Sequence, residues 1–129
     1  MTQSQPHSFR RAVEAGDLEA IVATLSPGVV FHSPVVHRPI VGRADVTSLL
    51  EAVVATFQDF RYTQEFHDGP RSVLVFEARV GDRSLQGVDL LERDEDGLIE
   101  RLTVMVRPLS GLTALGEAVR ARLEQDTTQ

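Results

Sequence analysis

The stretch AGDLEAIVATLSPGVVFHSPVVHRPIVGR, residues 15–43, decides the fold because it sets the order of the first structural elements. Gly16 is typical of a helix end, and Asp17 can cap a following helix. A short second helix that stops at Ser-Pro-Gly is indicated by apolar residues at helical spacing, namely Leu18, Ile21, Val22 and Leu25. The β-branched and aromatic run at 29–36 favours a short strand broken at Pro34. The stretch therefore predicts two helices, a strand and a loop.

Three further helical patterns flank this stretch. A helix that begins near Ser8 is indicated upstream by Phe9, Ala12 and Val13. Downstream, residues 44–57 carry one apolar helical stripe, formed by Val46, Leu49, Leu50, Val53, Val54 and Phe57. A closing helix near the C-terminus is indicated by Leu112, Leu115, Val119 and Leu123.

Four strands are predicted between the last two of these helices. They cover residues 60–66, 72–80, 84–93 and 98–107. The turn-forming sequences DGPR, GDR and DEDG separate them at hairpin spacing, so we expect an antiparallel sheet and a solvated acidic turn before Gly97. Helices followed by an antiparallel sheet predict the α+β class, with helices packed on one face of a strongly curved sheet.

The length of 129 residues is common for a single domain with one core. We find no internal repeat or linker-like stretch in the sequence. One domain is therefore expected over 1–129, with polar and flexible ends at 1–7 and 124–129.

Composition excludes several classes of function. A net charge of -6 argues against nucleic acid as a partner, because phosphate backbones are held by clustered positive charge. All 13 basic residues are Arg, so lysine Schiff-base chemistry is excluded, and the absence of Cys excludes disulfides and thiol nucleophiles. The sequence shows no signal peptide or apolar run long enough to span a membrane, so we expect a cytoplasmic protein without a membrane partner. We also expect no cofactor and no metal, because the His spacing matches no metal motif.

Asp89 is the unexplained charge of the sequence, because it lies inside an apolar run of the predicted strand 84–93. Alternate residues of a strand share a face. The neighbouring strands have clear inner faces, but in this strand Leu85 and Leu91 compete with Val88 and Leu90. Periodicity alone therefore leaves the side chain of Asp89 unplaced.

The segment from Phe9 to Val106 resembles the superfamily of nuclear transport factor two, ketosteroid isomerase and the SnoaL-like polyketide cyclases. Residues 15–43 are similar to the isomerase's run from its AGDLDGI helices to a Pro and a Gly, and VDLLERDEDGLI, residues 88–99, resembles its IDHFRFNGAGKV hairpin. The resemblance implies a cone-shaped fold. It also implies a homodimer through the outer sheet face, here Val73, Val75, Thr103 and Met105.

By this resemblance Asp89 matches the isomerase's oxyanion-hole acid, a carboxyl group kept protonated by an apolar pocket. The match implies that Asp89 lies on the inner face of the sheet, where burial would raise its pKa. Two other positions depart from the isomerase. Ser33 stands in place of its catalytic Asp base, and Phe9 stands in place of its Tyr donor. The isomerase's own mechanism is therefore not expected.

The remaining candidates are weighed against structural roles. His32 and Ser33 lie near the expected pocket mouth and are candidate catalytic residues beside Asp89, although an ordinary surface His is the simpler interpretation. Tyr62 could present its hydroxyl to the cavity, although packing is the commoner role. The residues expected to line a ligand pocket are Phe9, Phe31, Leu50, Val54, Phe57, Tyr62, Phe76, Gly87, Leu91, Leu102 and Val104.

Two functions from different classes remain open. The first is a protein that encloses a small apolar or polycyclic ligand, with Asp89 as acid or oxyanion donor in a proton transfer or cyclisation. The second is a binding or dimerisation module without catalysis, in which Asp89 is a structural carboxylate.

Overall fold

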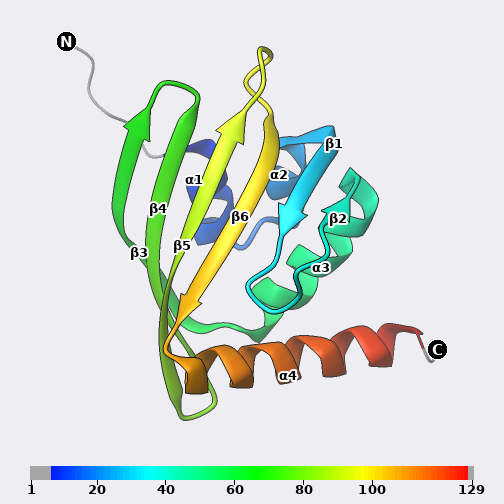
Figure 1. Ribbon diagram of the computed structural model, residues 1–129, viewed down its shortest axis with the longest axis vertical. Coiled ribbons are helices and arrows are strands. Elements are labelled where there is room, and N and C mark those ends of the chain that lie inside the picture. Colours follow the sequence, from blue (N-terminus) through cyan, green and yellow to red (C-terminus); the bar gives the residue numbers. More distant parts are fainter. Residues whose placement is uncertain (1–6, 128–129) are drawn as a thin grey trace.

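The computed structural model describes residues 7–127 and has helices packed on one face of a curved sheet (Figure 1). The four helices are α1 Ser8–Ala15, α2 Leu18–Ala23, α3 Arg43–Thr56 and α4 Leu109–Thr127. In Figure 1, α1 to α3 lie behind the sheet, and α4 crosses its lower end. The α+β fold class is therefore as predicted.

The six strands form one sheet in the order β2-β1-β6-β5-β4-β3. Their bounds are β1 Leu25–His32, β2 Ile40–Val41, β3 Gln58–Asp68, β4 Arg71–Val80, β5 Arg83–Arg93 and β6 Ile99–Arg107. Strands β3 to β6 pair antiparallel in sequence order, as the hairpin spacing predicts. The pairing of β1 with β6 is parallel, so the sheet is not antiparallel throughout.

The helix boundaries follow the predicted caps. Gly16 ends α1 in the left-handed conformation at φ 65°, which glycine adopts at little cost. The Asp17 carboxylate accepts the backbone N–H of Ala20 at 3.1 Å and caps α2. The turn after β5 is also as expected, because the Asp94 carboxylate accepts the N–H of Asp96 and of Leu98.

The first strand differs from the prediction at both ends. It begins at Leu25 rather than at residue 29, and its pairing with β6 is irregular between Leu25 and Val30. Pro27, which has no N–H for a ladder, lies within that irregular part. The strand ends at His32, and residues 40–41 form the short strand β2, which the sequence did not predict.

His7, which was expected in a polar and flexible end, has a defined place at the start of α1 in the structure. Its side chain is buried, and its Nδ1 atom accepts the backbone N–H of Phe9 at 3.0 Å. His7 therefore acts as the N-cap of α1. Residues 1–6 and 128–129 lie outside the described part of the chain.

The core lies between the inner face of the sheet and the helices. The inner faces of β4 and β6 are as predicted, with Leu74, Phe76 and Leu102 almost fully buried. The structure shows which residues of β5 lie on the inner face, a point that periodicity alone left open. Asp89 and Leu91 are buried on the inner face, opposite Val104 and Leu102 respectively in the register with β6.

Candidate functional site

A cavity of about 310 Å³ lies between the inner face of the sheet and the helices α1, α3 and α4. We call it the inner cavity. It brings together most of the residues expected to line a pocket, namely Phe9, Phe31, Leu50, Val54, Phe57, Tyr62, Phe76, Leu102 and Val104, together with Asp89. Its other lining residues are Val13, Glu14, Ala15, Gly16, Pro34, Val53, Phe60 and Leu115.

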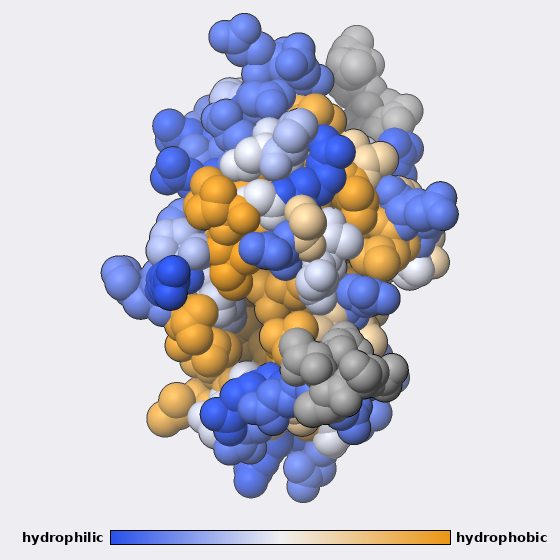
Figure 2. All heavy atoms as spheres, turned by 90° about the vertical axis from the view of Figure 1, so that its right-hand side faces the viewer, coloured by the Kyte–Doolittle hydropathy of each residue, from blue (hydrophilic) through white to orange (hydrophobic). Residues whose placement is uncertain are grey.

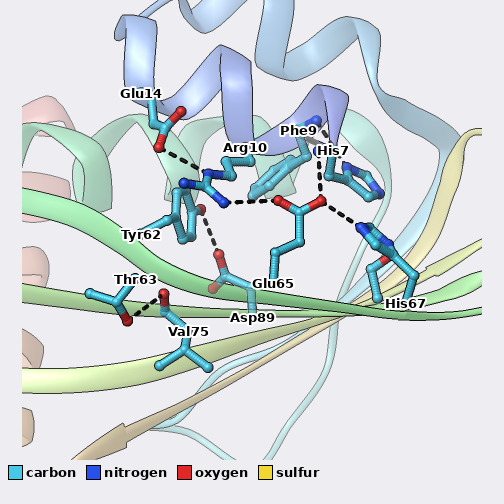
Figure 3. Close-up of polar contacts among 11 residues, drawn as sticks. His7, Phe9, Arg10, Glu14, Tyr62, Thr63, Glu65, His67, Val75 and Asp89 are labelled. Atoms are coloured by element: carbon cyan, nitrogen blue, oxygen red, sulfur yellow. Dashed lines mark hydrogen bonds and ion pairs between the residues drawn. The ribbon is translucent and has the colours of Figure 1, made fainter. Parts of the chain in front are cut away.

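Asp89 and Tyr62 form a buried polar pair in the wall of this cavity (Figure 3). The Tyr62 hydroxyl, from β3, donates to Oδ2 of Asp89, from β5, at 2.7 Å. Both side chains are more than nine-tenths buried. Among residues 7–127, Tyr62 is the hydrogen-bond partner of the Asp89 carboxyl, which leaves the second carboxyl oxygen available to a bound molecule.

Burial sets the protonation state of this pair. Removal from water raises the pKa of Asp89 to about 7, although the hydrogen bond from Tyr62 lowers it. Burial and the neighbouring Asp89 charge raise the pKa of Tyr62 well above its ordinary value. Near neutral pH, Asp89 can therefore hold or release a proton, while Tyr62 stays a neutral donor.

Glu14 also lines the cavity, but its side chain is 40% exposed and lies at the rim. It was not among the predicted site residues. Arg10, one turn earlier on α1, donates to Glu14 at 3.0 Å and to Glu65 on β3 at 2.9 Å. The Arg10 guanidinium also lies 5.7 Å from the centroid of the Tyr62 ring (Figure 3). Arg10 thus ties the rim of the cavity to the strand that carries Tyr62. The sequence signal that could have indicated the Arg10–Glu14 contact is the spacing of an Arg and a Glu four residues apart on a helix.

Aromatic rings form one wall of the inner cavity. Phe60 stacks on Phe76 at a centroid distance of 5.0 Å and meets the Tyr62 ring edge-on at 4.9 Å. Phe57 packs against both phenylalanines. Such offset and edge-on contacts favour fixed ring positions. The wall therefore holds Tyr62 in a defined orientation toward Asp89.

Two residues expected to line the pocket do not do so. The space above Gly87 is filled by the Phe76 ring, because a Cβ atom added at Gly87 would lie 2.3 Å from Cζ of Phe76. Gly87 therefore makes room for Phe76 and not for a ligand. Leu91 is fully buried in the core, next to Leu102 in register, and is absent from the cavity lining.

The structure also separates His32 and Ser33 from Asp89. Phe31 faces the interior, so His32 points to the opposite face of the sheet, where it pairs in register with Thr103. The Ser33 hydroxyl accepts the N–H of Val35 at 2.9 Å and forms a local turn. Neither residue lines the inner cavity, and Ser33 lines a neighbouring hollow instead, so the structure does not bring them together with Asp89.

Two further findings bear on the candidate chemistry. Within residues 7–127, no group of three or more His, Asp or Glu side chains is placed to hold a metal ion. No helix in that part of the chain is long and apolar enough to cross a membrane. Glu77 and Arg79 of β4 form surface ion pairs with Arg61 and Asp59 of β3, respectively.

The fold and the site together define an α+β protein with a buried carboxyl group in the wall of a largely apolar cavity. The model of the SnoaL-like domain family matches residues 7–102, and the chain belongs to this family. No curated protein matches the chain significantly.

Solved structures agree with the family assignment. A steroid delta-isomerase from Pseudomonas aeruginosa is similar with 40% identity and a TM-score of 0.90, over 94% of this chain and 90% of that one. An uncharacterised protein with a cystatin-like fold from Silicibacter pomeroyi shares 33% identity with a TM-score of 0.89, over 94% and 86% of the two chains. An NTF2-like protein from Mesorhizobium loti has 19% identity and a TM-score of 0.69, over 82% and 98%, and shows the fold alone.

Proposed function

We propose that the protein binds a small apolar compound through one of its oxygen atoms and moves a proton within it. The observation that carries this proposal is the buried pair of Asp89 and Tyr62 in the wall of a largely apolar cavity. A buried carboxyl group with a strongly raised pKa is typical of functional sites. The similarity to a steroid delta-isomerase supports a polycyclic ketone as the class of substrate to test first.

In this proposal Asp89 acts on the carbonyl oxygen. Its protonated form donates a hydrogen bond from the carboxyl oxygen that Tyr62 does not occupy. This bond strengthens when the carbonyl becomes an enolate, because negative charge then develops on the oxygen. Tyr62 keeps the carboxyl group oriented toward the cavity.

The proton transfer itself needs a base, and the residue at position 33 does not supply one. Glu14 is the other carboxylate in the lining, and we propose that it takes this role. Its carboxylate removes a proton from the carbon beside the carbonyl, and the C–H electron pair forms the enolate double bond. The same proton then returns to the γ-carbon, which moves the double bond into conjugation without loss of atoms.

The second candidate function is a binding module without catalysis. Phe9 lines the cavity without a hydroxyl group, and the Ser33 hydroxyl is engaged in a turn outside the cavity. The Glu14 side chain is also held in an ion pair with Arg10 and is 40% exposed at the rim of the cavity. These observations favour a protein that holds a ligand at Asp89 and does not transform it.

A turnover and binding assay separates the two functions. A β,γ-unsaturated steroid ketone is the substrate, its conversion is followed by the absorbance of the conjugated product, and its binding by calorimetry. We expect Asp89→Leu and Glu14→Gln to lower the rate by about 100-fold or more, because general acid or base groups contribute that much. Binding without turnover would support the module, and the absence of both would refute the proposal.

We also propose that two copies pair through the outer sheet face around Val73, Val75, Thr103 and Met105. Met105 is 54% exposed there, and the two valines are half-buried in the single chain. An exposed apolar face on a sheet is typical of an interface.

A further inference from the structure

A second hollow adjoins the inner cavity on its outer side. It measures about 610 Å³ and lies between α4, α3 and the turn at 33–36, and we call it the outer hollow. Figure 2 shows apolar side chains gathered around a hollow above the lower end of the molecule, where α4 crosses. Its rim exposes large apolar side chains, with Val35 at 53% and Leu109 at 77%. Such an exposed apolar concavity is typical of a binding site.

The two spaces share a wall. Phe31, Pro34, Val53 and Leu115 line both of them. The apolar stripe of α3 is divided in the same way, because Leu50 faces the inner cavity and Leu49 faces the outer hollow. The inner cavity and the outer hollow are therefore direct neighbours, and the layer between them consists of apolar side chains.

Polar groups are distributed unevenly across the two spaces. Asp89 and Tyr62 lie in the wall of the inner cavity with Glu14 at its rim, and the four shared residues are apolar. The lining of the outer hollow again includes charged residues, namely Glu117 and Arg120. The arrangement matches a molecule with an oxygen-bearing head, an apolar middle and an end near water.

We propose that the outer hollow binds the apolar tail of the same ligand whose oxygen contacts Asp89. This inference rests on the proposed function, and it specifies the ligand as an elongated carbonyl compound with an alkyl tail. The inner cavity alone lies at the lower end of the usual range of ligand pockets, roughly 300 to 1,000 Å³. The outer hollow, at about 610 Å³, supplies space that a compact ligand would leave empty.

The close approach of α4 to the turn supports a narrow occupant. A Cβ atom added at Gly116 would lie 3.3 Å from both Cγ atoms of Val35, so glycine allows the helix to approach the turn this closely. A hollow bordered by a helix and a turn suits an inserted chain of methylene groups better than the flat face of a second protein.

The chain offers a direct probe of the head site. It has one Tyr and no Trp, so its intrinsic emission reports Tyr62 alone. Straight-chain methyl ketones of increasing length serve as ligands, and the change in Tyr62 emission gives their affinities. Chemical shifts of ¹³C-labelled Leu112 methyl groups report the tail site, because Leu112 lines the outer hollow and is absent from the inner lining.

We expect the affinity of the native protein to rise about fourfold for each methylene group that enters the outer hollow. Thr113→Phe fills this hollow from α4 and should keep the affinity for the shortest ketones while removing the rise with length. Ala121→Phe is the matched control, because Ala121 is an exposed α4 position outside both linings, and it should behave like the native protein.

The outcomes distinguish the two proposals. A Tyr62 response without shifts at Leu112, or an unchanged rise with length in Thr113→Phe, would overturn the tail site and leave the proposed function standing. Shifts at Leu112 without any Tyr62 response would refute the head site and this inference with it. Shifts of Leu112 that depend on protein concentration without ligand would show a second copy in the hollow and would also overturn the inference.

Discussion

At the scale of single residues, Asp89 couples the site to the stability of the fold. Its pKa is raised from 3.8 to about 7 in the folded state, so the unfolded chain releases this proton first as the pH rises. Unfolding therefore becomes more favourable across that window. The burial that poises Asp89 for chemistry near neutral pH thus lowers stability at the same pH.

Asp89→Asn should remove this pH-dependent loss. The amide can still accept the Tyr62 hydroxyl and cannot ionise, so the variant should gain stability over the native protein as the pH rises from about 4 to about 7. The full pKa shift corresponds to roughly 4 kcal/mol. Urea denaturation at a series of pH values measures the difference, and a difference that does not change with pH would contradict the prediction.

The stability of the Asp89→Asn variant is compared with that of the native protein at each pH, because His7 also makes stability depend on pH. Burial and the positive charge of Arg93 lower its pKa from 6.5 to about 4, so His7 is neutral in the folded state. Its contribution to stability is lost as the pH falls from 6.5 toward 4, which is opposite in direction to the effect of Asp89. The His7 contribution is present in both proteins and cancels in the difference.

Tyr62→Phe tests the hydrogen bond of the pair. The hydroxyl lowers the pKa of Asp89, so its removal should raise that pKa above about 7. The variant should also lose about 1 to 3 kcal/mol of stability near neutral pH, because a buried acceptor loses its partner. Carboxyl ¹³C NMR titration of Asp89 measures the shift, and an unchanged or lower midpoint would show that the bond does not form in solution.

At the scale of elements, Gly87 of β5 leaves the space that the Phe76 ring fills on the inner face of the sheet. A methyl group there would overlap the Phe76 ring and would also lie 2.7 Å from the Met105 carbonyl oxygen. Gly87→Ala should therefore destabilise the fold by about 1 to 3 kcal/mol, or displace Phe76 into the inner cavity and weaken ligand binding.

Gly28→Ala is the matched control for that experiment. Gly28 also lies in a strand, and a Cβ atom there would meet nothing within 4 Å. Its effect on stability should stay within about 0.5 kcal/mol, as is usual for surface substitutions. Equal denaturation midpoints for the two variants would show that Phe76 does not depend on the space above Gly87.

Local patterns explain which elements the sequence could predict. Caps, helical stripes and hairpin turns are short-range signals, and they located α1 to α4 and β3 to β6. The start of β1 was missed because Pro27 and Gly28 read as a break, while the long-range pairing of Leu25 with Ile99 holds the strand there. Tertiary pairing of this kind leaves no local signal.

The same limit applies to the site. The alternation of β5 could not place Asp89, and the family resemblance did. It could not show that Tyr62, 27 residues earlier, would donate to that carboxyl group, because the contact depends on how β3 and β5 curve toward each other. His32 and Ser33 were expected near the pocket mouth, but His32 lies on the opposite face of the sheet, and the Ser33 hydroxyl forms a turn outside the inner cavity.

At the scale of the whole molecule, the proposed dimer uses the sheet face opposite the cavity. Met105→Glu would place a charge on that face and should convert the dimer to a monomer, as measured by light scattering after size exclusion. Val41→Glu is the control, because Val41 is 61% exposed on β2 and lies outside the proposed interface. A native protein that is monomeric at all concentrations would contradict the proposal.

The proposed ligand site and the proposed dimer interface lie on opposite faces of the sheet, so ligand binding and pairing can be tested separately. The inner face carries Asp89, while the proposed interface residues project from the outer face. A monomeric Met105→Glu variant should therefore bind methyl ketones with nearly the affinity of the native protein. Loss of binding together with the dimer would indicate that pairing shapes the inner cavity.

The ¹³C NMR titration of the Asp89 carboxyl group in the native protein tests the central claim most directly. A buried acid in the wall of an apolar cavity should titrate with a midpoint near 7, and the emission of Tyr62, its hydrogen-bond donor, should change over the same pH range. A midpoint near the ordinary aspartate value of about 4 would show that Asp89 is solvated or ion-paired, and would contradict its role as the acid of the site.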